Sequence, residues 1–192
     1  MERLLSNKKF LLIAVIAAVL AIYFIPLGSH ALLEPDEGRY SEIPREMIET
    51  GNFITRMLNY VKYFEKPVLL YWMNAASFMA FGQNEFAARF ATALCAVAGA
   101  FATGMFGAWL FGGTAGLLSG VVTALSLLYF AIGTINITDM PLGFFLTIAL
   151  ASFYVGHISR DKRWYLLFYA AMALGLLTKG LVAIVLPGGV IF

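Results

Sequence analysis

Residues 10–27 have the sequence FLLIAVIAAVLAIYFIPL, an uncharged run within a chain of 192 residues. As a single helix this run would extend about 27 Å, close to the roughly 30 Å of a bilayer's hydrocarbon core. Arg3, Lys8 and Lys9 precede it, so a signal peptide is the alternative. No small-x-small cleavage site follows cleanly, however, and the apolar run is long. We therefore expect an uncleaved first membrane span.

The composition of the whole chain agrees with a lipid environment. Hydrophobic residues make up 61% and charged residues 12%, with a mean hydropathy of +0.83, whereas soluble domains carry about 25% charged residues. The net charge of +2 comes from basic residues near helix ends, which excludes a nucleic-acid-binding face. The single Cys95 excludes an intrachain disulfide and a thiolate metal cluster. The sequence predicts an all-α, polytopic membrane protein.

Five further apolar runs follow the first one. The predicted spans lie near 10–27, 86–111, 114–135, 140–157, 164–178 and 181–192. Residues 31–82 form an outer loop, whose apolar part at 68–82 is short for a crossing. The chain ends inside the sixth run, so we expect residues 1–192 to be the amino-terminal part of a longer transmembrane domain.

The basic residues predict the orientation of these spans. Short cytoplasmic loops carry an excess of Lys and Arg, which places the amino terminus and the loop SRDKRW at 159–164 in the cytoplasm. The number of spans satisfies both placements only if residues 68–82 do not cross. The outer loop, Asp139 and Lys179 then share the outer face.

The outer loop concentrates ionisable groups. Seven of the 11 acidic residues lie between Glu34 and Glu65. The segment SEIPREMIETG at 41–51 has apolar residues at helical spacing and Gly51 as a stop, which predicts an amphipathic helix on the membrane surface. The segment YFEKPVLLYW at 63–72 places aromatic rings beside a charged pair, as is typical of the headgroup layer.

Two carboxylates are the strongest candidates for chemistry. Asp36 follows the first span directly, and Asp139 is the only acid between Glu85 and Asp161. Each has a simpler interpretation as a helix cap: Asp36 for a helix starting near Ser41, and Asp139 for the fourth span. Two acids from distant parts of the chain on one membrane surface nevertheless indicate a functional site.

Glu65 and Lys66 form a second candidate group. As an isolated pair they would be a surface salt bridge worth about 0–1 kcal/mol. An ammonium at headgroup depth can also bind a lipid phosphate, and Arg39 and Lys179 would add positive charge to such a pocket.

Several of these motifs together resemble a known family. DEGRYSEIPREMIETGNF, YFEKPVLLYW, GQNEFAARF and ITDMPL occur in this order. The chain is similar in them to the amino-terminal part of bacterial aminoarabinose transferases of lipid A and related protein O-mannosyltransferases. The resemblance implies the GT-C membrane fold, with roughly a dozen spans and a carboxy-terminal soluble domain in the full-length relatives.

The resemblance also implies roles for individual residues. Asp36 matches an acid taken as the catalytic base or its electrostatic equivalent, and Asp139 matches a second acid near the acceptor. Glu65 matches a residue near a bound divalent metal, so a metal is a possible cofactor whose other ligands would lie elsewhere. The resemblance implies substrate contacts for Arg39, Tyr40, Glu65 and Lys66, and the neighbouring charges and aromatic rings add Glu37, Tyr63 and Lys179 to the residues expected to bind substrate.

The resemblance therefore predicts a glycosyltransferase of the bacterial inner membrane with a periplasmic or extracellular active face. Its expected donor is a polyprenyl-phosphate-linked sugar, and its acceptor is a lipid A-type molecule, another glycan or a protein. Membrane lipids would surround it. The alternatives are a transporter, which would place ionisable residues near the middle of spans, and a non-catalytic membrane scaffold, which needs no ordered set of outer acids.

Overall fold

The computed structural model of the protein describes residues 2–191, and side chains from residue 10 onward. Phe192, the last residue of the sixth predicted span, and the side chains of Arg3, Lys8 and Lys9 lie outside this part. The elements in chain order are α1 (Glu2–Phe24), η1 (Ile25–Gly28), α2 (Asp36–Thr50), β1 (Met57–Leu58), β2 (Val61–Lys62), α3 (Leu69–Phe81), α4 (Glu85–Phe111), α5 (Gly113–Leu125), α6 (Leu127–Gly133), α7 (Asp139–Ser159), α8 (Arg163–Lys179) and α9 (Val182–Ile191).

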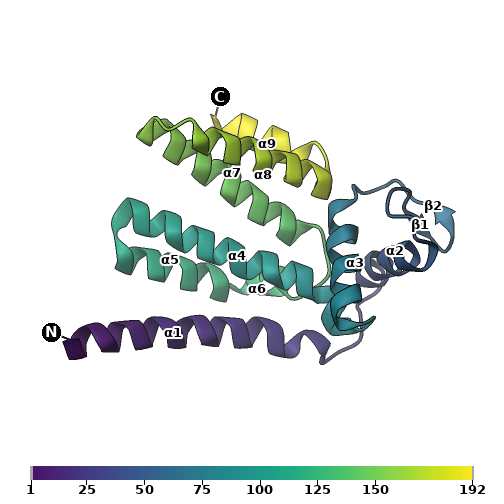
Figure 1. Ribbon diagram of the computed structural model, residues 1–192, viewed down its shortest axis with the longest axis horizontal. Coiled ribbons are helices and arrows are strands. Elements are labelled where there is room, and N and C mark those ends of the chain that lie inside the picture. The colour runs from purple at the N-terminus through teal and green to yellow at the C-terminus, as the bar shows by residue number, and fades with distance from the viewer. Residues whose placement is uncertain (1, 192) are drawn as a thin grey trace.

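The long helices run side by side, and the outer loop folds against one end of them (Figure 1). That end, called here the loop end, comprises residues 25–84, 134–139 and 179–182. The amino terminus and the turns after α4 and after α7 lie at the opposite end (Figure 1). This arrangement agrees with the predicted grouping of the outer loop, Asp139 and Lys179 on one face.

Among the described residues, three helical segments are long and apolar enough to cross a membrane, Phe10–Gly28, Glu85–Phe111 and Asp139–Ser159, and the bent pair α5 and α6 would make a fourth if it is one span. The three segments coincide with the first, second and fourth predicted spans. Helix α3 has 13 residues, or about 20 Å of length, and lies across the loop end rather than along the bundle (Figure 1). Helices α8 and α9, with 17 and 10 residues, are shorter, so the fifth and sixth spans stay predictions.

The third predicted span, residues 114–135, differs from expectation because it is not one continuous helix. Helices α5 and α6 meet at an angle of 64°. Ser126 between them has an extended backbone with ψ 133°, and its hydroxyl donates a hydrogen bond to the Thr123 carbonyl oxygen at 3.1 Å. A serine can satisfy a backbone group that a helix break sets free, which makes this break possible inside an apolar run.

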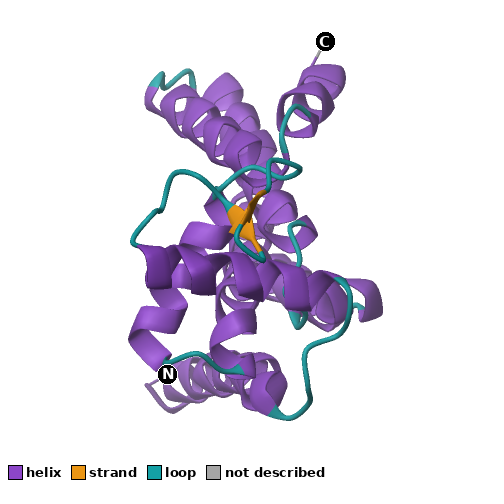
Figure 2. Cartoon of the chain, turned by 90° about the vertical axis from the view of Figure 1, so that its right-hand side faces the viewer, coloured by secondary structure: helices purple, strands orange, loops and turns teal. Residues whose placement is uncertain are grey.

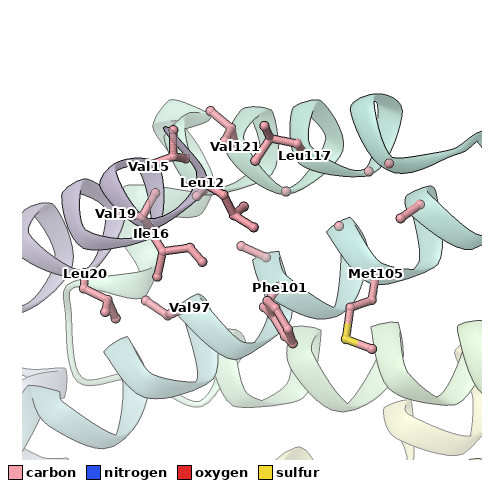
Figure 3. A pocket seen from close by; sticks show the side chains of 17 residues that line it. Leu12, Val15, Ile16, Val19, Leu20, Val97, Phe101, Met105, Leu117 and Val121 are labelled. Carbon is pink, nitrogen blue, oxygen red and sulfur yellow. The ribbon is translucent and has the colours of Figure 1, made fainter. Parts of the chain in front are cut away.

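Small residues let α4 and α5 pack closely, as their glycines predict. A Cβ atom added at Gly104 would lie 3.1 Å from the carbonyl oxygen of Gly116. Helix α1 lies less tightly against this pair, and an apolar groove of about 260 Å³ remains between the three helices. Leu12 and Ile16 of α1 and Phe101 and Met105 of α4 are among the side chains that line it (Figure 3). Its lining is apolar throughout, so it is not the polar candidate site.

The outer loop forms a small unit of its own at the loop end. Helix α2 begins at Asp36, five residues before the predicted start at Ser41, and ends at Gly51 with a left-handed φ of 69° as predicted. The two short strands pair antiparallel in front of α2 (Figure 2), a hairpin that the sequence analysis did not predict. The Glu46 carboxylate holds it to α2 by accepting the Tyr60 backbone N–H at 3.1 Å.

Candidate functional site

Helix α2 packs against α3 through apolar side chains. Tyr40, Ile43 and Met47 are buried on its inner face, where they pack against Leu70 and Tyr71 of α3. The Tyr40 and Tyr71 rings have centroids 6.1 Å apart. This apolar contact fixes α2 on the loop end and leaves Asp36 and Arg39 nearer to the surface.

One surface group, called here the basic cluster, consists of Arg39, Tyr63, Glu65 and Lys66. The Tyr63 hydroxyl donates to Glu65 Oε2 at 2.8 Å and accepts from Arg39 Nη1 at 3.5 Å. Glu65 also lies 3.6 Å from Arg39 and 3.7 Å from Lys66. The structure thus brings together four predicted substrate-binding residues from α2 and from the segment after β2. Two cations around one carboxylate leave the group with net positive charge.

The same contacts shift the pKa values within the basic cluster. The hydrogen bond from Tyr63 and the nearby Lys66 and Arg39 lower the pKa of Glu65. The hydrogen bond to Tyr63 raises the pKa of Arg39. Both groups therefore stay charged at neutral pH.

Asp36 and Tyr40 adjoin the basic cluster. Asp36 is exposed in the first turn of α2, where the helix dipole stabilises a negatively charged carboxylate. Burial raises the pKa of Tyr40, and the negative charge of Asp36 adds to the rise. Asp36 also favours the charged form of Arg39. An exposed carboxylate thus lies within electrostatic reach of a positive group.

Asp139 and Lys179 form a second surface pair at the loop end. Lys179 Nζ donates to Asp139 Oδ1, and both side chains are partly exposed. The predicted capping role of Asp139 is wrong by one position: Thr138 occupies the N-cap and Asp139 is the first residue of α7. Asp139 therefore forms an ion pair with Lys179 of α8 and does not cap α7.

Glu37 lies apart from both surface groups. It is 1% exposed, and its carboxylate oxygens accept from Arg89 Nε and Nη2, each at 2.8 Å. Burial would raise the pKa of Glu37, but the bonds from Arg89 and from the Leu33 and Asn136 backbone N–H groups outweigh it and lower the pKa. Glu37 is thus part of the scaffold beneath the site, a position that does not favour its predicted role as a substrate ligand.

Four residues at the loop end are buried although the sequence patterns predicted no buried role for them: Arg89, Asn74, Asn136 and Tyr71. Tyr71 was instead expected among the aromatic rings of the headgroup layer. A signal was present for the other three. Arg89 is a charge inside an apolar run, and the two asparagines carry amides in apolar surroundings. Groups of this kind are costly to bury unless they are paired, so their isolation in the sequence predicts partners. Tyr71 carries no comparable signal among its aromatic neighbours.

The residues around Glu65 do not fit a metal ion by themselves. Glu65 is a single carboxylate between Arg39 and Lys66, and neighbouring cations oppose binding of another cation. No group of three or more His, Cys, Asp or Glu side chains in the described part of the chain is placed to hold a metal. The metal implied for Glu65 therefore has no support from these residues.

Comparisons with known proteins agree with this architecture. Residues 9–192 match the family described as dolichyl-phosphate-mannose-protein mannosyltransferase. The chain is 34% identical over 186 residues to the undecaprenyl phosphate-alpha-4-amino-4-deoxy-L-arabinose arabinosyl transferase of Wigglesworthia glossinidia brevipalpis, covering 94% of this chain and 33% of that protein. The corresponding transferase 1 of Proteus mirabilis is 39% identical over 178 residues, covering 88% of this chain and 32% of that protein.

Two solved structures share the fold. The crystal structure of ArnT from Cupriavidus metallidurans in the apo state has a TM-score of 0.91 and 33% identity, covering 95% of this chain and 35% of that one. The structure of the same protein bound to undecaprenyl phosphate has a TM-score of 0.90 and 33% identity, covering 94% of this chain and 34% of that one. The predicted GT-C-like all-α fold is confirmed.

The chain spans about a third of the length of the curated relatives that it matches. Its candidate spans and its bacterial relatives indicate a protein of the inner membrane. The match over residues 9–192 and the ordered motifs of the outer loop lead to one assignment. The chain belongs to the dolichyl-phosphate-mannose-protein mannosyltransferase family.

Proposed function

We propose that this chain carries the donor-binding and acidic part of a membrane glycosyltransferase. The enzyme would move a sugar from a polyprenyl-phosphate donor to a lipid A-type molecule, another glycan or a protein. The observation that carries the proposal is the gathering of Asp36 and the basic cluster at one end of the bundle. Support comes from relatives that are named arabinosyl transferases and from a similar protein with bound undecaprenyl phosphate.

The basic cluster suits the phosphate of such a donor. Arg39 and Lys66 side chains are 28% and 29% exposed, so their charged ends are accessible from the surface. When the bond between the sugar carbon and the phosphate oxygen breaks, negative charge grows on the departing phosphate. Cations held in place beforehand stabilise that charge without reorganising during the reaction.

Asp36 suits the role of general base. The acceptor hydroxyl or phosphate must lose, or already lack, a proton as its oxygen attacks the sugar carbon, and a carboxylate within hydrogen-bond reach can take a proton that is still present. A single inverting displacement needs one base and no covalent sugar intermediate, in contrast to a retaining glycosidase. Asp139 is less suited to be the base because Lys179 occupies one of its oxygens. We place Asp139 and Lys179 near the acceptor.

We further propose that the loop end faces the periplasm. The basic turn after α7 contains Arg160, Lys162 and Arg163 and lies at the opposite end of the bundle (Figure 1). The excess of positive charge that is usual in cytoplasmic loops supports a cytoplasmic position for that turn. A polyprenyl donor could then reach the basic cluster from the outer leaflet, with its phosphate at headgroup depth.

The test is sugar transfer by the full-length protein in proteoliposomes. The donor is undecaprenyl phosphate linked to 4-amino-4-deoxy-L-arabinose, and lipid A is the first acceptor assayed. We expect Asp36→Asn to lower the rate of transfer by about 100-fold or more, since general-base catalysis contributes roughly 10²–10⁴-fold. Insertion into the membrane should be unchanged.

Asp161→Asn is the matched control. Asp161 is also an exposed aspartate, but it lies in the turn between α7 and α8 at the far end of the bundle. Its variant should transfer sugar at the parental rate. Parental turnover in Asp36→Asn would remove Asp36 from the chemistry, and absence of transfer to lipid A, glycan and protein acceptors alike would contradict the proposed activity.

A further inference from the structure

Arg89 is the centre of a buried polar network at the loop end. Its guanidinium has five N–H donors, and all five have acceptors. Two go to the Glu37 carboxylate at 2.8 Å. The other three go to backbone carbonyl oxygens of Leu27 at 2.7 Å, His30 at 2.9 Å and Ala31 at 2.9 Å. Arg89 thus joins α4 to α2 and to the end of the first span.

Glu37 extends this network to the segment before α7. Its Oε1 atom accepts the Asn136 backbone N–H at 2.7 Å. Glu37 is the neighbour of Asp36, and Asn136 lies three residues before Asp139. One hydrogen bond therefore connects the immediate surroundings of the two candidate acids, which are about 100 residues apart in the chain.

The Asn136 side chain also holds the segment before α7 in place, through two further hydrogen bonds. Its Nδ2 atom donates to Ser41 Oγ of α2 at 3.2 Å, and its Oδ1 atom accepts from Asn74 Nδ2 of α3 at 2.9 Å. Asn74 Nδ2 also lies 3.3 Å from the Tyr40 carbonyl oxygen. Asn136 is 0% exposed, so water does not compete for these bonds.

We propose that Asn136 is a positioning residue for the transfer reaction, which sets where Asp139 lies relative to Asp36. This inference rests on the proposed function. The Asn136 side chain is buried, and its hydrogen bonds go to Asn74 and Ser41 rather than to the basic cluster, so it acts through the segment that leads into α7. A displacement of about 1 Å in reacting groups can reduce a rate by roughly 100-fold, which makes a rigid connection between the two acids consequential.

The kinetic test uses Asn136→Ala in the full-length protein. This variant loses the contacts to Ser41 and Asn74, while the backbone N–H bond to Glu37 is retained. We expect kcat for transfer to fall by about 10- to 100-fold, with KM for the undecaprenyl-phosphate-linked donor unchanged because the basic cluster is intact. Asn52→Ala, in the loop before the hairpin, is the matched control and should keep both constants.

A distance measurement tests the positioning independently of activity. Nitroxide labels are attached to cysteines introduced at positions 36 and 139, with Cys95→Ala and any other native cysteine of the full-length protein replaced, and the distance between the labels is measured by pulsed electron paramagnetic resonance. We expect one narrow distribution for the parent and for Asn52→Ala, and a shifted or broadened one for Asn136→Ala. Because both acids are replaced by the labels, this result does not depend on whether the protein transfers sugar.

The two measurements separate the possible failures. If the parent transfers no sugar but Asn136→Ala broadens the distance distribution, the proposed function fails and the positioning stands. An unchanged distribution or an unchanged kcat in a folded Asn136→Ala protein would overturn the inference. Should that variant fail to fold, Ser41→Ala removes only the 3.2 Å contact, and it must shift kcat and the distribution in the same direction, by a smaller amount.

Discussion

Glu37 and Asp36 are neighbours in the sequence, but their side chains lie in different environments. Asp36 is exposed, whereas Glu37 is buried against Arg89. Removing one partner of such a pair leaves an uncompensated buried charge, which typically costs about 3–5 kcal/mol. Glu37 is therefore a residue whose loss should affect stability before it affects substrate binding.

The lowered pKa of Glu37 predicts how stability depends on pH. The unfolded chain binds the proton with a pKa near 4.3, and the folded chain binds it only at lower pH. The contribution of Glu37 is thus fully present above about pH 5 and is lost as the pH falls through its folded pKa. Thermal unfolding of the purified full-length protein in detergent, measured between neutral pH and pH 3, should show a decline below about pH 4.5.

Two variants on α2 show whether this decline belongs to Glu37. Glu37→Gln should be less stable than the parent at neutral pH and should show a smaller further loss in acid. Glu42→Gln is the matched control: Arg45 also lowers the pKa of Glu42, but the Glu42 side chain is 31% exposed, so solvent screens the pair and its loss should matter less. A Glu37→Gln protein with the same acid dependence as the parent would contradict the buried pair.

For single residues, the sequence predicted which charged side chains belong to the outer loop better than it predicted whether each one is buried or exposed. Arg39, Glu65 and Lys66 were predicted to share a positive pocket at headgroup depth, and the structure brings these three together. Lys179 was predicted to add charge to the same pocket, but it pairs with Asp139 instead. Glu37 could not be separated from Asp36, since its environment depends on Arg89, 52 positions away. No local pattern contains a pairing over that distance.

Helix α2 shows what limits prediction at the level of elements. Its end at Gly51 follows from a local requirement for a left-handed residue. Its start at Asp36 does not, because Pro44 lies inside the helix and a proline is best tolerated in the first turn, which favours a start near Ser41. The Leu33 backbone N–H bond to Glu37 Oε2, at 2.8 Å, holds the first turn in place, and that bond depends on the tertiary pairing with Arg89.

The contact between α4 and α5 leads to a prediction about small residues. A Cβ atom at Gly116 would lie 2.6 Å from the Gly104 carbonyl oxygen, which is backbone and cannot move independently. Gly116→Ala should therefore force the two helices apart and lower the unfolding midpoint in detergent, at a cost of about 1–3 kcal/mol for overpacking.

Gly113→Ala is the control on the same helix. A Cβ atom at Gly113 meets nothing within 4 Å, so this variant should differ from the parent by no more than about 0.5 kcal/mol. Equal effects of the two substitutions would mean that helix propensity, rather than close packing, decides the stability of this pair.

For the whole molecule, apolar run lengths predicted the helical membrane fold well because a bilayer imposes a length on each span. They could not predict the 64° break between α5 and α6, since an uncharged run of sufficient length looks continuous whether or not it bends. Similarly, the hairpin is held by Glu46 of α2, a partner outside its own sequence. The composition shows that most of the chain lies in lipid, but it does not show which helices and strands contact one another.

The arrangement of the two ends makes a prediction about the whole molecule in its membrane. Asp36→Cys and Asp161→Cys are introduced separately into the full-length protein, with Cys95→Ala and any other native cysteine replaced, and the variants are studied in right-side-out vesicles. Both positions are exposed aspartates, and they lie at opposite ends of the bundle (Figure 1). Position 36 should react with a membrane-impermeant maleimide directly, and position 161 only after the vesicles are permeabilised, because the proposed orientation puts the basic turn in the cytoplasm. Asp139→Cys should follow position 36. Labelling of positions 36 and 139 from opposite sides would be incompatible with a shared site, and labelling of position 161 alone in sealed vesicles would reverse the proposed orientation.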